Sequence, residues 1–395
     1  MSKIIHIFDD EKFIDVAIEL FESIVPGQSK YFVISDNNDL SLNLVQNKQA
    51  QAIHLKTEQQ LDELAFIINN SESKIVYAHA LNSRKQKLIS KLNFEITLVW
   101  FIWGYDLYVQ WLPLKHKIYE KKTAAFLNRK NTYLEIIKND ILFKTKIYKL
   151  FKTSNKTYNS IFAQCVNKVD ICVPVIPTEI ESVREINKNI IYAPFTYGSL
   201  DNLKITRKKN VKRSDENILV GNSADPANNH IEIFERLSKL NLGSRQIIVP
   251  LSYSGNEEYK DFILKRGNEL LGHNFKPLTE FVSFENYNDI ISSCNYAIFN
   301  HIRQQALGNI ITMGFMGAKL FFNSKGVVYK YYKTLGLNCE LVENLSQNDI
   351  EIKLTDKQIA ENQKILKLKY DIEIVKDKVK ELIKITNDVA RKKNE

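Results

Sequence analysis

The chain has 395 residues, of which 44% are hydrophobic and 26% charged, and its formal net charge is +9. This composition excludes a disordered or collagen-like chain and gives enough length for two domains with separate cores. The four cysteines are too few and too scattered for a disulfide framework or a Cys-x-x-Cys metal site, and no secretory signal pattern begins the chain. No window reaches the roughly eighteen uninterrupted apolar residues that a membrane-spanning helix needs. We therefore expect a cytoplasmic protein that does not cross a bilayer.

Short apolar runs alternate with amphipathic segments in the first half of the chain. An apolar run at 4–8 precedes a helical pattern over 10–23, and another apolar run follows at 31–34. This order is typical of a β-α-β unit and predicts a parallel sheet. Further strands are predicted at 74–78, 95–103, 169–173 and 189–193. We assign residues 1–198 to a first Rossmann-like domain.

A polar, basic stretch without apolar periodicity, residues 199–216, is interpreted as a linker. A second alternating series over 217–354 predicts another Rossmann-like domain. Its expected strands are 218–221, 246–250, 278–282, 296–300 and 320–323. Its expected helices are 229–240, 259–272, 287–294 and 310–317. The Lys- and Glu-rich remainder, 355–395, has apolar residues at helical spacing and predicts a helical tail.

The positive charge is concentrated in one segment of the first domain. Between Lys115 and Lys156 there are twelve lysines and arginines against three acidic residues, a local excess of nine. Aromatic and aliphatic residues alternate with these charges, as in helices that lie on an anionic membrane surface. We expect membrane contact here, through Lys144, Lys146, Lys149 and Lys152. The alternatives are a solvated helix pair whose apolar side is core, and a nucleic-acid patch, which no recognised motif supports.

The loop that begins at Gly221 is rich in small and amide side chains, including Asn222 and Ser223. A small residue at a strand end lets a ligand approach the backbone, and free N–H groups before the next helix favour a phosphate. An ordinary turn with a helix cap is the alternative. The loop lacks the three glycines of a dinucleotide-binding fingerprint, so it does not predict NAD binding.

A second polar loop follows the predicted strand 296–300 and precedes an apolar helix. It contains one arginine and several amide side chains: Arg303, Gln304, Gln305 and Asn309. A positive charge and N–H donors at a helix N-terminus are what a diphosphate requires. Gly308 belongs to the helix that follows, and it allows close packing on the sheet. The alternative is that Arg303 only pairs with a surface carboxylate.

In the first domain, candidate acid-base residues follow two predicted strands. An aromatic run that includes Trp103 surrounds Asp106, and partial desolvation by such neighbours suits a general base or an acceptor for a sugar hydroxyl. Asp106 could equally cap a helix. His79 is a second candidate base, although a lone histidine is more often structural.

Four runs in this order carry a family resemblance: Trp100–Tyr108; Ile218–Ser223 with Asp225 and Asn229–Ile231; Val249–Tyr253; and Arg303–Gln305 with Gly308. Together they resemble the 4-acetamido-4,6-dideoxy-D-galactose (Fuc4NAc) transferases, glycosyltransferase family 56, which act in enterobacterial common antigen synthesis. The resemblance extends from about residue 74 to about residue 323. The chain departs from the expected pattern at Phe101, where a histidine is expected, and in its longer basic segment.

The resemblance implies a metal-independent GT-B glycosyltransferase with two Rossmann-like domains that face each other across a cleft. Such an enzyme needs no cofactor and takes a sugar from a TDP-sugar to an undecaprenyl-diphosphate-linked glycan at the inner face of the bacterial cytoplasmic membrane. By analogy, the donor lies around Gly221, Asn222, Ser223, Tyr253, Arg303, Gln304, Gln305, Gly308 and Asn309. The acceptor lies near His79, Trp103 and Asp106.

Our mechanistic hypothesis is that Arg303 and the helix N-terminus near Gly308 stabilise the departing diphosphate, in place of a divalent metal. Asp106 is the first candidate for the base, and His79 the second. Two other functions remain open at this point. One is transfer to a soluble or protein acceptor, and the other is a non-catalytic, membrane-associated scaffold that binds nucleotide sugars.

Overall fold

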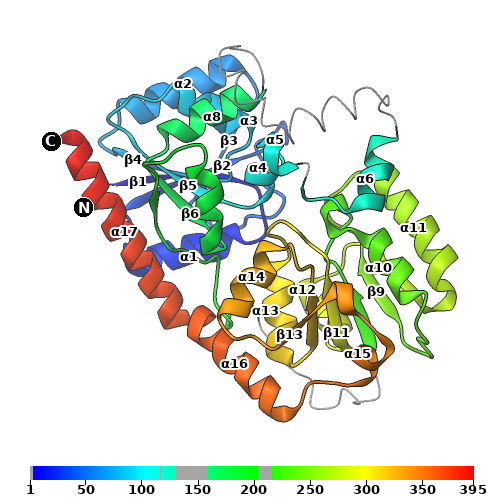
Figure 1. Cartoon of the computed structure of the whole chain (residues 1–395). Helices are drawn as coiled ribbons and strands as arrows, with labels where there is room; N and C mark the ends of the chain where they lie inside the picture. Colours follow the sequence, from blue (N-terminus) through cyan, green and yellow to red (C-terminus); the bar gives the residue numbers. More distant parts are fainter. Residues whose placement is uncertain (1–2, 116, 130–157, 204–215) are drawn as a thin grey trace. The chain divides into compact units, whose positions relative to one another are not determined.

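The computed structural model describes residues 3–115, 117–129, 158–203 and 216–395. These residues form two compact units, each built on one parallel β-sheet (Figure 1). The first unit holds the described residues up to Leu114, those from 158 to Asn202, and Tyr370–Glu395. The second holds the described residues from Lys115 to Arg129 and from Leu203 to Lys369.

The sheet of the first unit has seven strands among the described residues, in the order β3-β2-β1-β4-β5-β6-β7. Their bounds are β1 (Ile4–Asp9), β2 (Ser29–Ile34), β3 (Ala50–Ile53), β4 (Ile75–His79), β5 (Thr97–Ile102), β6 (Ile171–Pro174) and β7 (Ile191–Tyr192). Every residue of β4 and β5 is buried. Central parallel strands are covered on both faces, which is why they form continuous apolar runs in the sequence.

The helices of the first unit are amphipathic and bury one side on this sheet. Their bounds are α1 (Ile14–Ile24), α2 (Glu58–Asn69), α3 (Ser83–Ser90), α4 (Tyr105–Tyr108), α5 (Leu112–Lys115), α8 (Tyr158–Lys168) and α9 (Ile180–Arg184). In α1, residues Ile14, Ala17, Ile18 and Phe21 recur at helical spacing and lie in the core.

The sheet of the second unit has six strands within the described part of the chain, in the order β10-β9-β8-β11-β12-β13. Their bounds are β8 (Asn217–Val220), β9 (Ile247–Pro250), β10 (Phe275–Leu278), β11 (Cys294–Phe299), β12 (Lys319–Phe322) and β13 (Cys339–Leu341). The order reverses between β8 and β11, and in such sheets ligands bind beyond the carboxyl ends of the strands at this reversal. The predicted pair of doubly wound α/β domains is thus confirmed as two parallel sheets.

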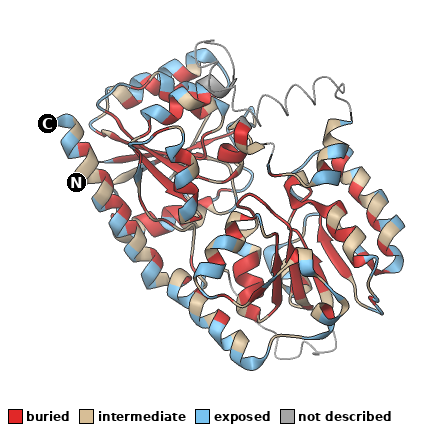
Figure 2. Cartoon of the chain, viewed as in Figure 1, coloured by how far each residue is buried: buried red, intermediate tan, exposed pale blue. Residues whose placement is uncertain are grey.

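Helices join the strands of the second unit, and Figure 2 shows buried residues along the strands and on the helix sides that meet them. The bounds are α6 (Lys121–Asn128), α10 (His230–Leu237), α11 (Glu257–Leu271), α12 (Phe284–Ile291), α13 (Leu307–Met316), α14 (Val327–Thr334) and α15 (Gln347–Glu351).

The end of the chain is helical, as predicted, and consists of α16 (Asp356–Tyr370) and α17 (Ile372–Asn394). The two helices belong to different units, with α17 in the first. Its residues Val375, Val379 and Leu382 join the core of that unit, and Tyr77 donates a hydrogen bond to Thr386 Oγ1 at 3.0 Å. The last helix therefore completes the first core, whereas the predicted boundaries treat residues 355–395 as a separate tail.

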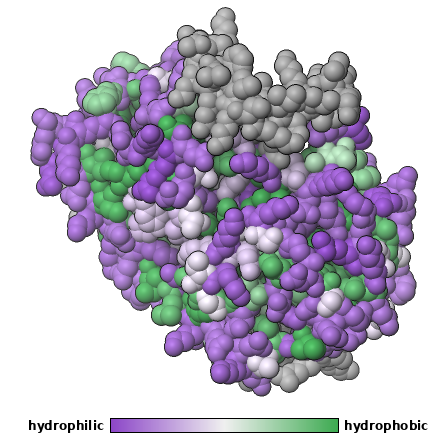
Figure 3. Space-filling model, in the orientation of Figure 1, coloured by the Kyte–Doolittle hydropathy of each residue, from purple (hydrophilic) through white to green (hydrophobic). Residues whose placement is uncertain are grey.

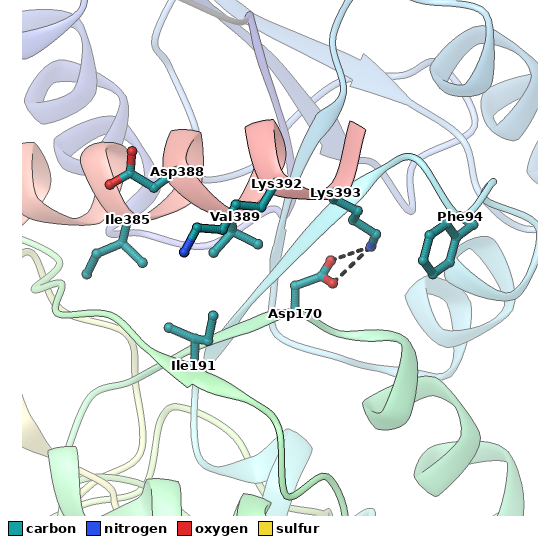
Figure 4. Close-up of a pocket in the computed structure, with 8 residues that line it drawn as sticks. All are labelled: Phe94, Asp170, Ile191, Ile385, Asp388, Val389, Lys392 and Lys393. Atoms are coloured by element: carbon teal, nitrogen blue, oxygen red, sulfur yellow. Dashed lines mark hydrogen bonds and ion pairs between the residues drawn. The ribbon is translucent and has the colours of Figure 1, made fainter. Parts of the chain in front are cut away.

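A pocket of about 420 Å³ lies between α17 and the amino end of β6 (Figure 4). Lys393 reaches across it to Asp170, the residue before β6, with Nζ 2.7 Å from Oδ2. Phe94, Ile191 and Val389 contribute apolar lining. The pocket lies at the amino ends of the strands, at the edge of the first sheet opposite to the loops that follow β1, β4 and β5.

Residues 117–129, which the sequence places inside the first domain, lie in the second unit instead. Backbone N–H groups of Lys122 and Thr123 donate to Glu232 Oε1 on α10, at 2.8 and 2.9 Å. Phe126 stacks on Phe262 of α11 with ring centroids 3.9 Å apart. These contacts fix α6 on the second unit, although its position in the chain is between β5 and β6.

One predicted strand is wrong. Residues 278–282 are not a strand, and the edge strand β10 ends at Leu278, where the prediction begins. Pro277 lies within β10, which an edge strand tolerates because one side of it needs no N–H donor. Phe281, which suggested a buried run, is 77% exposed in the loop that follows.

No helix in the described ranges is long and apolar enough to cross a membrane. Hydrophilic side chains cover most of the face shown in Figure 3. The four lysines predicted to contact a membrane, Lys144, Lys146, Lys149 and Lys152, lie outside the described residues. In the described part of the basic segment, Lys122 pairs with Glu235 and Arg129 pairs with Glu258.

Candidate functional site

The loops after β8 and β11 contact each other at the carboxyl edge of the second sheet. Gln305 Nε2 donates to Asn222 Oδ1 at 2.9 Å and lies 3.3 Å from Ser223 Oγ. These three residues, all predicted to bind the sugar donor, come from segments about eighty positions apart in the sequence, and the structure brings them together. The strand order explains the meeting, because β8 and β11 are neighbours in the sheet.

Gly221 directly follows β8 with a φ of +68°, and a Cβ atom there would lie 2.5 Å from Asn228 Oδ1. Glycine is required for both reasons. Asn228 Oδ1 also accepts hydrogen bonds from Asn222 N and His301 Nε2, at 3.0 and 2.7 Å. The sequence analysis missed Asn228 and His301, although both are in the polar runs that it identified.

Arg303 is 5% exposed and is held by two acceptors. Its Nη2 lies 3.1 Å from Asp225 Oδ2, and its Nη1 donates to Gln304 O at 2.9 Å. Arg303 therefore does pair with a carboxylate, which was the alternative stated for it in the sequence analysis. The partner is Asp225 in the neighbouring loop, and the pair is largely buried. A buried guanidinium held in this way presents a fixed positive charge at the strand end.

Helix α13 begins beside this pair without a side-chain cap. The residue before it, Ala306, has a φ of +61° and offers no side-chain acceptor, so the first N–H groups of the helix lack the usual capping partner. A Cβ atom at Gly308 would meet nothing within 4 Å, which leaves space at the first turn. Asn309 was predicted to bind the sugar donor. Its Nδ2 donates a hydrogen bond to Tyr287 OH on α12 at 2.7 Å, so the side chain has a partner within the second unit.

Several buried polar atoms near this helix have no hydrogen-bond partner in the described structure. They are Arg303 Nε, Gln304 Oε1, Gln305 Oε1 and His301 Nδ1. Native proteins keep few such atoms, because each one costs about 1–3 kcal/mol. Arg303 Nε and the uncapped helix N-terminus offer donors that fit an anionic group, whereas the two glutamine oxygens and His301 Nδ1 are acceptors that fit hydroxyl groups. The loop can therefore accommodate a ligand that carries both.

Tyr253, predicted to contact the donor, follows β9 at the same edge of the sheet. Its carbonyl accepts from Ala224 N at 2.9 Å, which ties the loop after β9 to the loop after β8. Its side chain is 41% exposed. The backbone of Tyr253 therefore supports the loop after β8.

In the first unit, His79 is a core residue and not a group at the surface. Its ring lies between Phe8 and Phe101, with centroids 3.8 and 4.0 Å away. Its two nitrogens contact Tyr197 OH at 2.5 Å and His6 Nδ1 at 3.2 Å. Burial holds the pKa of His79 well below 6.5, so the ring is neutral. The surroundings of His79 are those of a structural core histidine, the alternative that the sequence analysis left open.

A chain of side-chain contacts leads from the edge of the sheet to its core. Trp103 Nε1 can only donate, and it donates to Tyr197 OH at 2.7 Å. Tyr197 OH contacts His79 Nδ1, and His79 Nε2 contacts His6 Nδ1. Trp103, which was predicted to lie near the glycan acceptor, is thus held at the carboxyl edge of the sheet by a series of hydrogen bonds that ends at His6 in the core.

Asp106 is fully buried, and its carboxylate accepts three hydrogen bonds. The donors are Trp100 Nε1 at 2.7 Å, Leu81 N at 2.9 Å and Trp103 N at 3.0 Å. Burial raises the pKa of Asp106, and these donors oppose that shift. The carboxylate holds the loop after β5 to the loop after β4, so its geometry fits the structural role and not that of a base at the surface.

A carboxylate that the sequence analysis missed lies at the end of β1. Asp9 is 18% exposed, accepts from Asn82 Nδ2 at 3.0 Å, and lies 2.7 Å from Lys85 Nζ. Lys85 is fully buried, and burial lowers its pKa while Asp9 opposes that shift. An aspartate at the carboxyl end of a central parallel strand could have signalled this site from the sequence alone.

No group of three or more His, Cys, Asp or Glu side chains in the described ranges is placed to hold a metal ion. The polar groups at the two sheet edges include arginine, lysine, amide and backbone donors, together with the carboxylates of Asp9, Asp106 and Asp225. The chemistry of these donors is that of anion and hydroxyl binding.

Two parallel Rossmann-like sheets of this kind are the architecture of the GT-B fold. The fold is similar to that of the HepE protein of Anabaena in complex with UDP and glucose, with a TM-score of 0.62 and 12% identity, over 97% of this chain and 100% of that chain. It is also similar to sucrose-phosphate synthase from Thermosynechococcus elongatus, with a TM-score of 0.61 and 11% identity, over 98% of this chain and 100% of that chain. WaaG, a glycosyltransferase involved in lipopolysaccharide biosynthesis, gives a TM-score of 0.52 and 10% identity, with 98% of each chain covered.

Residues 176–366 match a family model described as 4-alpha-L-fucosyltransferase glycosyl transferase group 56. The matched range contains both loops at the edge of the second sheet. The match confirms the resemblance to group 56 found in the sequence motifs. The chain is therefore a glycosyltransferase of the GT-B type, related to group 56.

Proposed function

We propose that this glycosyltransferase takes a sugar from a nucleoside-diphosphate donor, with TDP as the expected nucleotide, and transfers it to an oligosaccharide linked to undecaprenyl diphosphate. The expected sugar is a deoxy-amino hexose or fucose, the sugar that the description of the matching family names. The expected place is the cytoplasmic side of the bacterial inner membrane, in the synthesis of a surface polysaccharide. WaaG, similar in fold, takes part in lipopolysaccharide biosynthesis.

The observation that carries the proposal is the uncapped N-terminus of α13 beside the buried Arg303. A diphosphate would accept from the first N–H groups of the helix and would meet the positive charge of Arg303. The amide side chains of Gln304 and Gln305 lie in the same loop. HepE, whose fold is similar, was solved with UDP and glucose.

In the transfer step, the acceptor oxygen forms a bond to the anomeric carbon while the bond from that carbon to the diphosphate oxygen breaks. The electron pair of the broken bond stays on the diphosphate, where Arg303 and α13 stabilise the added charge. The proton of the acceptor hydroxyl passes to a base. Electrostatic stabilisation of this kind is what a preorganised arginine and a helix N-terminus supply.

Since Asp106 and His79 are buried, we propose Asp9 as the base on the acceptor side. It is at the end of the central strand β1, and Asn82 and Lys85 orient its carboxylate. Asp9→Asn should lower the turnover number by about a hundredfold or more, with unchanged nucleotide affinity. Full turnover by this variant would exclude Asp9 from proton transfer.

Membrane contact would rest on the lysines beyond the described residues, Lys144, Lys146, Lys149 and Lys152. Each lysine near an anionic surface contributes about 1 kcal/mol of attraction. Reversing all four charges should therefore abolish co-sedimentation with phosphatidylglycerol vesicles and leave nucleotide binding intact. Unchanged vesicle binding would contradict this part of the proposal and favour a soluble acceptor.

The deciding experiment compares two ion-paired arginines at opposite edges of the second sheet. Arg303 pairs with Asp225 at the carboxyl edge, whereas Arg245 pairs with Glu216 at the amino edge. Calorimetric titration with TDP, UDP, GDP and CMP should show binding of TDP or UDP to the wild type and to Arg245→Gln. Arg303→Gln should bind at least about a hundredfold more weakly, because a charge-assisted contact is lost. No binding to the wild type, or equal affinity in both variants, would overturn the donor site.

A further inference from the structure

Three residues of the segment before α6 are held against the edge of the second sheet by one asparagine. Asn229 is fully buried and has a φ of +51°. Its Nδ2 donates to Ile118 O at 3.2 Å, and its Oδ1 accepts from Glu120 N at 2.8 Å. The amide therefore binds the backbone on both sides of Tyr119. These two hydrogen bonds fix the backbone position from which the Tyr119 side chain extends.

The side chain of Glu120 adds a second attachment. Its Oε1 accepts from Asn323 Nδ2 at 3.0 Å, and the same Nδ2 donates to Asn300 Oδ1 at 2.8 Å. Asn323 and Asn300 directly follow β12 and β11. The segment is thus bonded to the loops after β8 and β12, and both of these are bonded to Asn300 in the loop after β11.

Tyr119 lies between the two backbone groups that Asn229 binds, in the same group of loops as the ion pair of the proposed donor site. The charges of both Asp225 and Arg303 act on its phenol, and burial raises the pKa of Tyr119 to about 12. The hydroxyl is therefore protonated at neutral pH and can donate a hydrogen bond. Nearby, Arg303 Nε and the side-chain oxygens of Gln304 and Gln305 have no partner in the described structure, which independently indicates that a ligand completes this region.

We propose that Tyr119 is a donor-binding residue, whose hydroxyl donates a hydrogen bond to the diphosphate of the sugar nucleotide next to Arg303, and that Asn229 is its positioning residue. This inference rests on the proposed function. It assigns to the donor site a residue from the segment between β5 and β6, which belongs to the first half of the sequence. The segment then has a role in the second unit that its place in the chain does not suggest.

The second sheet offers a matched control. Tyr296 in β11 is also buried beside an arginine and a carboxylate, Arg245 and Glu216, and its pKa is likewise raised to about 12. That pair precedes β9 and β8, at the opposite edge of the sheet. Tyr119→Phe and Tyr296→Phe therefore remove the same hydroxyl from similar surroundings, one at the donor site and one away from it.

We expect Tyr119→Phe to weaken the binding of TDP or UDP, measured by calorimetry on the full chain, about tenfold, the loss of one hydrogen bond to a charged group. Tyr296→Phe should change the affinity less than about twofold. Asn229→Gly keeps the left-handed backbone conformation and removes both bonds that flank Tyr119, so it should weaken binding at least as much as Tyr119→Phe. Equal affinities for the two phenylalanine variants would overturn the inference.

The outcomes separate this inference from the function on which it rests. Absence of nucleotide binding in the wild type would remove the donor site itself. Binding that Arg303→Gln abolishes but Tyr119→Phe leaves unchanged would keep the donor site and exclude Tyr119 from it. A lower melting temperature with unchanged nucleotide affinity in Tyr119→Phe would show that the hydroxyl only supports the fold, which also overturns the inference.

Discussion

The carboxyl edges of the two sheets differ in how their buried polar groups are satisfied. At the first edge, Asp106 accepts three hydrogen bonds and His79 has a partner at each nitrogen. At the second, Arg303, Gln304 and Gln305 each have a buried atom without a partner in the described structure. Because such atoms destabilise a fold, their concentration at one edge indicates where a ligand supplies the missing partners.

The helices after equivalent strands show the same contrast. β4 and β11 each lie beside the first strand of their sheet, on the side where the strand order reverses. The helix after β4, α3, is capped by Asn82, whose side chain accepts from Lys85 N at 3.1 Å. The helix after β11, α13, has no side-chain cap. At the first edge a side chain of the protein itself caps the helix N-terminus, whereas at the second edge the helix N-terminus remains available for an anion.

The largest expected effect tests the structural role of the first edge. Asp106→Ala leaves three buried donors without an acceptor, so the free energy of unfolding should fall by about 3–5 kcal/mol. Nucleotide affinity of the folded variant should not change, since the donor site is in the other unit. Urea denaturation and calorimetry measure the two quantities. Unchanged stability together with lost transfer would instead restore Asp106 as the catalytic base.

The roles at the two edges were predictable from the sequence to different degrees. That Arg303 and Gln305 lie at the carboxyl edge of the second sheet was predictable, because they follow an apolar strand directly. The role of Asp106 was not, since the sequence does not show that Trp100, Leu81 and Trp103 donate to one carboxylate. A buried acceptor and an exposed base have the same local sequence.

Long-range packing explains the remaining differences. The apolar spacing of α17 predicted a helix, but not that Val379 and Leu382 would enter the first core. In the same way, nothing in residues 117–129 identifies α10 and α11 as their partners. Periodicity predicts which side of a helix is buried, and the partner depends on tertiary contacts between distant parts of the chain.

A second prediction uses the pairs of buried histidines, one pair in each unit. Burial lowers the pKa of His6 and His230 to about 3 and holds those of His79 and His301 well below 6.5. Below pH 6.5 the unfolded chain binds more protons than the folded protein, so the free energy of unfolding should decrease as the pH is lowered. Each imidazole contributes up to about 1.4 kcal/mol per pH unit. The raised pKa of Asp106 has the opposite effect on the free energy of unfolding, but it is one group against the four histidines.

Urea denaturation at pH 7, 6 and 5 measures this slope, with the exposed His273 as control. His79→Gln and His301→Gln should each reduce the slope by about the contribution of one proton, whereas His273→Gln should leave it unchanged. A slope that His79→Gln reduces and His301→Gln does not would show that His301 takes up a proton in the folded state. That result would sharpen the comparison, because it would make the second edge accessible to protons and the first edge closed.

The smallest expected change in stability gives the most specific test of the second edge. Gly308 lies in the first turn of α13, where an added Cβ meets nothing within 4 Å. Gly308→Ala and Gly308→Asp should both raise the free energy of unfolding by about 0.5–1 kcal/mol, the first through helix propensity and the second also through a negative charge at the helix N-terminus. Only the aspartate places a carboxylate where the diphosphate would lie. It should weaken TDP or UDP binding at least about tenfold, while the alanine variant stays within about threefold of the wild type. If both variants bind nucleotide equally well, the diphosphate does not lie at α13, and the unsatisfied groups of this edge must serve another ligand.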